Sequence, residues 1–111
     1  MEIDTKPLGD RSVVLRLDGR LNMVAAPRLK TAVESAVDGG APRVVVDLSD
    51  VAFMDSSGLG ALIAALKRTR QAQGDLRIAG VNAQVATVLK LTNLDRVLRP
   101  FPTVEAATDG W

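Results

Sequence analysis

The run Arg43-Val-Val-Val-Asp-Leu48 constrains the fold of this chain more than any other feature. Its three consecutive valines lack the alternation of apolar and polar residues that marks a strand with one solvated face. Short, almost continuous β-branched runs are typical of strands buried on both faces of a mostly parallel sheet. Parallel strands need long connections between them, and these are usually helices. The run therefore predicts a central strand with helices packed around it.

Strand and helix patterns alternate on both sides of this run. Residues 12–18 alternate apolar and polar side chains, which predicts a half-buried strand closed by Asp18-Gly19. The other predicted strands are residues 2–6, followed by a turn at 7–10, then residues 75–79 and 97–98, the last stopped by Pro100 and Pro102. The predicted helices are residues 24–38, 57–73, a segment that follows Asn82, and 103–108. Such alternation implies an α/β layered fold.

Local signals mark several helix ends. Pro27 suits a first helical turn, and Gly39-Gly40 is a stop signal after the first helix. Asn82 and Thr103 are good N-caps for the last two helices. No repeat or long linker interrupts the chain. We therefore expect a single domain over residues 1–111, with a mixed, largely parallel sheet of four or five strands and about four helices.

Composition argues against several function classes. The 111 residues carry 14 basic and 13 acidic side chains, only three aromatic ones, and neither histidine nor cysteine. Balanced charge and scarce aromatics argue against nucleic-acid binding. Without histidine or cysteine, the commonest general base and metal ligand and all thiolate chemistry are missing. We expect no catalytic residues, no metal and no cofactor.

Two further features concern location. The longest apolar or glycine run is the nine residues 58–66, shorter than the ~20 residues of a membrane helix. The N-terminal Met1-Glu-Ile-Asp lacks the basic and then apolar layout of a signal peptide. We therefore expect a cytoplasmic protein with no membrane partner.

The segment most informative about function runs from residue 44 to residue 66. It contains the buried strand, a predicted loop at residues 49–54, and the motif Asp55-Ser-Ser-Gly-Leu-Gly60, which opens a helix. Partners and ligands of α/β sheets usually bind at the carboxyl ends of strands, where this motif lies. Taken alone, three small polar residues before an apolar period are most simply a helix N-cap.

Sharper local interpretations of the motif fail. Gly58-Leu-Gly60 begins like a dinucleotide fingerprint, but Ile63 stands where the third glycine belongs. A nucleophile elbow needs Gly-x-Ser-x-Gly, which is absent. Three acids near one strand end could hold Mg²⁺, namely Asp47, Asp50 and Asp55. Their spacing matches no calcium loop, and separate structural roles explain them more simply.

The segment Asp47-Leu-Ser-Asp-Val-Ala-Phe-Met-Asp-Ser-Ser-Gly-Leu-Gly-Ala-Leu62 strongly resembles the STAS domain of bacterial anti-sigma factor antagonists. The resemblance covers nearly the whole chain. Upstream, residues 17–22 and 26–29 look like the family's entry from strand to helix, and downstream residues 94–98 and 104–107 look like its last strand and terminal helix. The resemblance implies a STAS-like fold.

The resemblance also implies a function as a partner switch. In that family the unphosphorylated protein binds an anti-sigma factor with an ATP-binding serine kinase fold, which frees a sigma factor. The kinase then phosphorylates the first serine of the motif, and a serine phosphatase restores it. By position, the acceptor here is Ser56, and the switch loop includes Asp55, Ser57, Gly58 and Leu59.

Three further residues are implied to face the partner: Asn22, Met23 and Met54. Asn22 departs from the family's usual aspartate, which leaves charge-dependent partner recognition open. A turn or helix-cap role for Asn22 is an equally good interpretation. For Met23 and Met54, and for Val24 beside them, core packing remains the alternative.

Other functions stay open. The chain could be a STAS accessory subunit of a lipid-transport ABC system, or a piece of an anion transporter. A receiver domain with Asp47 as acceptor would need an acidic pair after the first strand and a lysine after the last, and neither is visible. An enzyme with a serine–lysine catalytic dyad is formally possible, but no pattern places a lysine beside Ser56 or Ser57.

Overall fold

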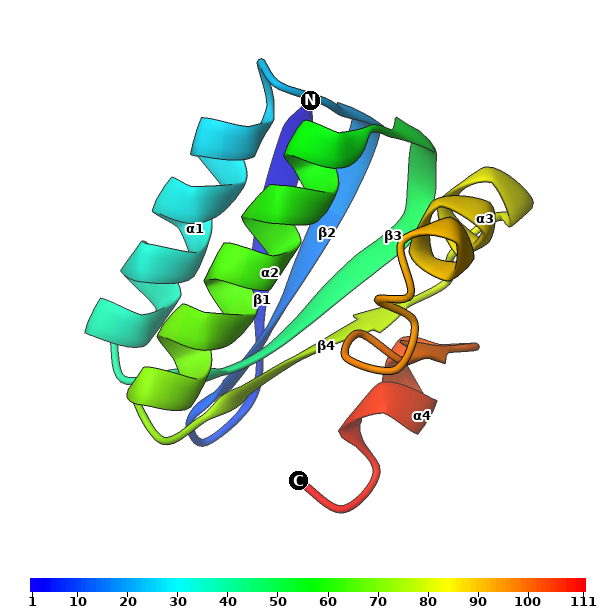
Figure 1. Ribbon diagram of the computed structural model, residues 1–111. Coiled ribbons are helices and arrows are strands. Elements are labelled where there is room, and N and C mark those ends of the chain that lie inside the picture. The colour runs from blue at the N-terminus through cyan, green and yellow to red at the C-terminus, as the bar shows by residue number, and fades with distance from the viewer.

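The valine run forms the middle of a five-stranded sheet of order β1-β2-β3-β4-β5 (Figure 1). The computed structural model describes all 111 residues. β3 (Arg43–Met54) pairs in parallel with β2 (Ser12–Leu21) and with β4 (Asp75–Ala79). β1 (Glu2–Gly9) is antiparallel to β2 at one edge, and β5 (Pro100–Phe101) is parallel to β4 at the other. The predicted mixed, largely parallel sheet is confirmed.

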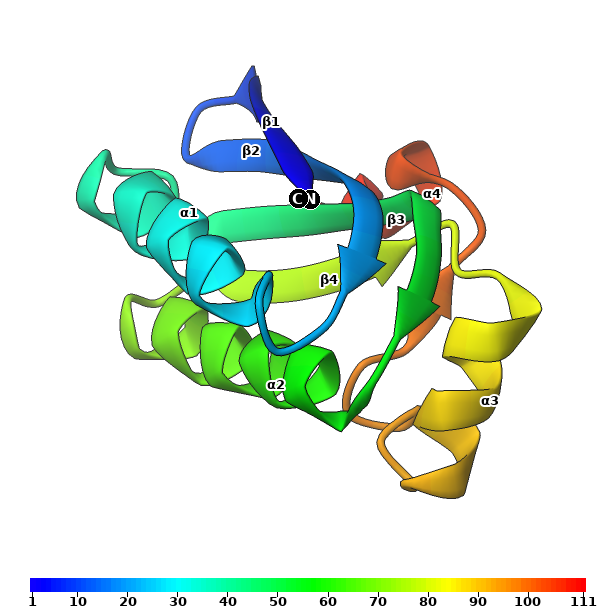
Figure 2. The same ribbon diagram turned by 90° about the horizontal axis from the view of Figure 1, so that it is seen from above.

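Four helices cover the sheet unequally. α1 (Ala26–Asp38) and α2 (Ser56–Gln71) lie side by side on one face, and α4 (Val104–Thr108) lies on the other (Figure 2). α3 (Ala83–Leu91) packs against β3 near its carboxyl end. None of the four helices combines the length and apolarity that a bilayer crossing requires.

The valines of β3 pack alternately into two separate cores. Val44 and Val46 belong to a cluster of 21 buried residues beneath α1 and α2. Val45 points the other way, into a cluster of four buried residues beneath α4. All three side chains are 0% exposed, which explains why the run lacks polar alternation.

The smaller core is closed by one arginine. The Arg77 guanidinium lies 4.4 Å from the ring centroid of Trp111 and 5.9 Å from that of Phe101. Its Nη1 donates a hydrogen bond of 2.8 Å to the Ala107 carbonyl at the end of α4. Cation–π contacts and one hydrogen bond thus fasten the C-terminal helix to β4.

Two strands extend further than predicted. β2 continues through Asp18-Gly19 to Leu21, and the predicted loop at residues 49–54 is the second half of β3. Their pairing shifts register twice, between Arg16 and Asp18 and between Gly19 and Arg20. Such bulges bend a strand without ending it. The two strands therefore curve together toward the start of α2 (Figure 2).

The predicted strand at residues 97–98 and the predicted turn at 7–10 are also misplaced. Val97 and Leu98 form a turn, because the N–H groups of both donate to the Leu94 carbonyl, and the strand follows at Pro100–Phe101. Proline is tolerated there because β5 is a short edge strand that needs few ladder bonds. At the other edge β1 continues through Pro7 to Gly9.

The predicted helices are found with small shifts at their ends. α1 begins at Ala26, not at residue 24, and α2 covers Ser56–Gln71 where residues 57–73 were predicted. The Asn82 side chain accepts from Val85 N–H, and the Thr103 side chain accepts from Ala106 N–H. Both predicted caps are therefore confirmed.

Candidate functional site

The motif lies at the carboxyl edge of the sheet, beside the loop that follows β2. Leu21 and Met54, the last residues of β2 and β3, are paired in register. Because the two strands are parallel, the loop beginning at Asn22 and the motif beginning at Asp55 leave the sheet next to each other. The backbone N–H of Asp55 donates to the Leu21 carbonyl at 3.3 Å, which ties the two loops together.

Asp55 caps α2, as its position predicts. Its Oδ1 accepts the backbone N–H of Gly58 at 2.9 Å, and its own carbonyl accepts the N–H of Leu59 at 3.0 Å. An acidic N-cap satisfies a free helix donor and complements the helix dipole. Ser56 is therefore the first residue inside a 16-residue helix.

Ser56 and Ser57 differ in accessibility. Ser56 is exposed, whereas Ser57 is half-buried. Neither hydroxyl makes a hydrogen bond within the protein. The side chain that caps this turn is that of Asp55. The Ser56 hydroxyl is thus free and faces solvent at the start of α2.

Gly58 is required by close packing. A Cβ on Gly58 would lie 2.2 Å from the carbonyl oxygen of Leu21 and 2.8 Å from the Leu21 Cγ. Gly58 and Leu59 are both buried, Leu59 at 4% exposure. These two residues seat the first turn of α2 against the end of β2, so the buried Leu59 side chain does not present a surface to a partner.

Asn22 forms the turn that leads into α1. Its Oδ1 accepts the backbone N–H groups of Val24 and Ala25, each at 3.1 Å. These contacts are those of an Asx turn, so the turn role is present in this structure. Beside it, Met23 and Val24 are 72% and 79% exposed.

The three apolar residues expected near the partner face separate into two kinds. Met23 and Val24 are among the most exposed large apolar side chains of the chain, so core packing is wrong for them. Met54 is 1% exposed and belongs to the main core. A direct partner contact by the Met54 side chain is therefore wrong, because β3 turns that side chain inward beneath α2.

Two amide side chains hold the end of β3, that of Gln84 in α3 and that of Asn82, the N-cap of α3, and this role was not predicted from the sequence. Gln84 Oε1 accepts the backbone N–H of Met54 at 2.9 Å, and its Nε2 donates to the Met54 carbonyl at 2.9 Å. Asn82 Nδ2 donates to the Val51 carbonyl at 3.0 Å. Gln84 thus acts as an extra pairing partner for the residue just before the motif. The one available signal is that two amide residues follow β4 at the same carboxyl edge.

We expect Gln84→Ala to lower the free energy of unfolding by about 1–3 kcal/mol, because it leaves two backbone groups of Met54 without partners. Gln84→Glu should fall between alanine and wild type, since a carboxylate accepts the N–H but has no donor for the carbonyl. Urea unfolding of the three proteins measures this. Equal stabilities for wild type and Gln84→Ala would contradict it.

The three acids that could have formed a metal site have separate roles. Asp47 accepts the N–H and hydroxyl of Ser49, and Asp55 caps α2. Asp50 forms an ion pair with Arg16 at 2.7 Å. The hydrogen bond and charge of Asp50 raise the pKa of Arg16 above its ordinary value. No three acidic side chains gather in the structure.

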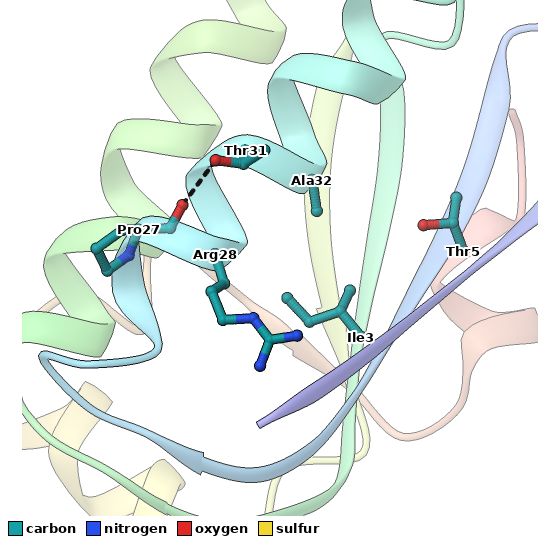
Figure 3. A pocket seen from close by; sticks show the side chains of 6 residues that line it. All are labelled: Ile3, Thr5, Pro27, Arg28, Thr31 and Ala32. Atoms are coloured by element: carbon teal, nitrogen blue, oxygen red, sulfur yellow. Dashed lines mark hydrogen bonds between the residues drawn. The ribbon is translucent and has the colours of Figure 1, made fainter.

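A hollow of about 360 Å³ lies between β1 and α1, away from the motif (Figure 3). No residue of the motif takes part in its lining, which consists of Ile3 and Thr5 of β1 and of Pro27, Arg28, Thr31 and Ala32 of α1. Its one charged side chain, Arg28, donates to the Met1 carbonyl. Ser56 thus lies on an open surface outside this hollow.

Comparison with known proteins decides the family. The STAS domain model matches residues 3–107, almost the entire chain. The chain belongs to the STAS domain family. This STAS protein is 26% identical over 110 residues to the anti-sigma-B factor antagonist of Listeria monocytogenes, covering 99% of this chain and 96% of the relative.

Solved structures agree with the fold of this STAS protein. A proposed anti-sigma factor antagonist of Thermotoga maritima superposes with a TM-score of 0.86 at 30% identity, covering 96% of this chain and 92% of the other. The Bacillus cell fate determinant SpoIIAA in its phosphorylated form superposes with a TM-score of 0.75 at 21% identity, covering 97% of each chain. At that identity the second likeness shows the fold alone.

Proposed function

We propose that this STAS protein is an anti-sigma factor antagonist controlled by phosphorylation of Ser56. Its unphosphorylated form binds an anti-sigma factor with an ATP-binding serine kinase fold, and the sigma factor is released. The kinase then modifies Ser56, and a serine phosphatase restores it. The chain is a substrate and a binding partner in this scheme. It acts without a metal, a cofactor or nucleic acid.

The observation that carries the proposal is the exposed, unbonded hydroxyl of Ser56 at the first position of α2. The loop after β2, which leaves the sheet beside the motif, presents two exposed apolar side chains, Met23 and Val24. Exposed apolar residues mark surfaces that bind partners, and a serine that can gain phosphate charge beside them allows that binding to be switched off. The names of the relatives, antagonists of anti-sigma factors, support the same function.

A phosphate at Ser56 is compatible with the fold. The N–H groups of Ser56 and Ser57 have no acceptor inside the helix, because the first N–H groups of a helix never do. Such donors, together with the dipole of a 16-residue helix, favour an anion. The modification therefore acts on binding more than on stability.

The same phosphate opposes docking. It adds about −1.5 to −2 charges at neutral pH, next to the carboxylate of Asp55. A partner that covers Ser56 would have to remove the water around these charges, and its bound nucleotide would repel them. The phosphorylated form should therefore dissociate from an ATP-loaded partner.

The decisive test uses the kinase-type anti-sigma factor of the same cell with ATP. Mass spectrometry should map one phosphate per chain to Ser56, and Ser56→Ala should remain unmodified. Ser57→Ala is the matched control, because it removes the neighbouring hydroxyl and should still accept phosphate. Phosphate on Ser57, on Ser49 or on an aspartate would contradict the proposal.

Asn22→Asp is expected to leave stability within about 0.5 kcal/mol of wild type. The carboxylate can accept the same two N–H groups as the amide oxygen. The added charge should change the association rate with a basic partner more than the dissociation rate, since charges at the rim of an interface act through steering. Binding kinetics over a range of salt concentrations measure this. Identical rates for both proteins would place Asn22 outside the interface.

A further inference from the structure

A basic hollow lies at the end of α2 remote from Ser56. It has a volume of about 180 Å³, and the charged residues of its lining are four arginines and one acid: Arg70, Arg77, Arg96, Arg99 and Asp75. At a helical rise of 1.5 Å per residue, Arg70 is ~21 Å along α2 from Ser56. The hollow is thus separate from the motif and from the exposed apolar residues of the loop after β2.

The positive charge of this hollow is only partly compensated. The Asp75 carboxylate is shared between two arginines, at 3.3 Å from Arg70 Nε and 3.5 Å from Arg77 Nε. No carboxylate lies within 4.0 Å of the Arg96 or Arg99 guanidinium group. The lining therefore carries four positive charges and one negative, a net charge of +3.

The four arginines differ in how many hydrogen-bond donors they have free. Arg77 already donates to a backbone carbonyl of α4 and lies over two aromatic rings, so it adds charge to the hollow more than donors. Arg70 donates only from Nε, to Asp75 at 3.3 Å, which leaves its two terminal amino groups free. The side chains of Arg96 and Arg99 make no hydrogen bond within the protein. Three guanidinium groups are therefore available to an anion.

Arg96 and Arg99 extend from a turn that the main core holds in place. The N–H groups of Val97 and Leu98 both donate to the Leu94 carbonyl, at 3.1 and 2.8 Å. Leu98 is 2% exposed and belongs to the main core, whereas the arginines on either side of it are exposed. Because the backbone of this turn is already ordered, binding there costs less conformational entropy than binding to a mobile loop.

The size and charge of the hollow indicate the class of ligand. Its 180 Å³ equal the liquid volume of about six water molecules at ~30 Å³ each, which is room for two linked phosphoryl groups but not for a nucleoside as well. A single phosphate ester carries about −1.5 to −2 charges near neutral pH, less than the lining can balance, whereas two linked groups carry more. Asp95, the other acid near this turn, lines a separate hollow beside α3.

We propose that this hollow binds a diphosphate, either free or as the charged group of a larger small molecule. Arg96 and Arg99 bind the phosphoryl oxygens in pairs of hydrogen bonds, since a planar guanidinium group matches that geometry. The terminal amino groups of Arg70 complete the site, and Asp75 holds Arg70 through its Nε. Since Ser56 is at the far end of α2, this ligand binds independently of the proposed switch.

The test titrates the full chain with inorganic pyrophosphate and follows amide chemical shifts in NMR. We expect one bound ion per chain, with shifts at Arg70 and at residues 75–77 and 96–99. The double variant Arg96→Gln, Arg99→Gln should bind at least about tenfold more weakly, since it removes charge-assisted hydrogen bonds. The double variant Arg96→Lys, Arg99→Lys should be intermediate, because it keeps both charges but loses the planar groups. Shifts confined to residues 56–58 would overturn the proposal, because the ion would then occupy the start of α2.

Two control proteins separate this site from general charge attraction and from the switch. Lys6→Gln, Lys30→Gln removes the same charge as the arginine double variant, from exposed lysines of β1 and α1 at the opposite edge of the sheet. It should bind pyrophosphate like wild type, and a loss as large as that of the arginine-to-glutamine variant would overturn the site. Ser56→Asp should also bind like wild type, since it changes only the far end of α2.

Two further probes define the ligand. Inorganic phosphate should bind more weakly than pyrophosphate, because it reaches fewer of the three available guanidinium groups. Equal affinity for the two ions would overturn the diphosphate assignment in favour of a site for a single phosphate. ADP distinguishes the two sources of a diphosphate. Binding as tight as that of pyrophosphate would support an organic diphosphate whose remainder lies outside the hollow, and weaker binding would support free pyrophosphate.

Discussion

Gly58→Ala is expected to lower the free energy of unfolding by about 3 kcal/mol, toward the upper end of what overpacking costs. The new methyl group would lie 2.2 Å from the Leu21 carbonyl oxygen, well inside van der Waals contact. That oxygen belongs to rigid backbone and already accepts the N–H of Asp55. Relief therefore requires the start of α2 to move away from the end of β2.

Gly60→Ala is the matched control for this substitution. Both glycines lie in the first turns of α2, but a Cβ on Gly60 would have no neighbour within 4 Å. Alanine there should raise stability by about 0.5–1 kcal/mol, since glycine is a poor residue inside a helix. Urea unfolding of both variants measures the two changes in stability, which are expected to have opposite signs. A Gly58→Ala protein as stable as wild type would show that α2 is not seated on Leu21.

Ser56→Asp is expected to weaken binding to the kinase-type partner at least about tenfold relative to Ser56→Ala, a difference of about 1.4 kcal/mol in binding free energy. The carboxylate places a fixed negative charge at the exposed first position of α2, beside Asp55. Stability should differ from wild type by about 1 kcal/mol or less in both variants, because Asp55 still caps the helix and the dipole tolerates an acid.

Ser56→Asn separates charge from size in the same measurement. Asparagine has nearly the shape of aspartate without its charge, so it should bind close to Ser56→Ala. Isothermal titration with the ATP-loaded partner gives the three affinities, and thermal unfolding gives the three stabilities. Equal affinities for the aspartate and alanine variants would contradict a charge-operated switch at this position.

The parts of the fold that the sequence predicts well are those encoded by local periodicity. The valine run identified β3 as central, and Asn82 and Thr103 cap the helices that they were expected to cap. Position along the chain likewise placed Asp55 at the start of α2. In each case neighbouring residues carry the whole signal, so no long-range contact was needed to read it.

The failures concern features that depend on distant residues. β3 extends to Met54 because β2 curves with it and Gln84 pairs with its last residue from 30 positions away. The same curvature turns the Met54 side chain into the core. The strand at Pro100 was missed because its acceptability depends on its place at the sheet edge. No local pattern around these residues encodes such contacts.

The inequality of the two cores has a consequence for the conformational ensemble. α4 has five residues and covers a core of four, whereas α1 and α2 cover a core of 21. Sub-global opening follows the weakest contacts, so α4 is expected to detach far more often than the whole domain unfolds. Each such excursion uncovers Val14 and Val45 while the larger core stays intact. Concentrated samples should then associate through this transiently bare sheet face at temperatures below the global melting point.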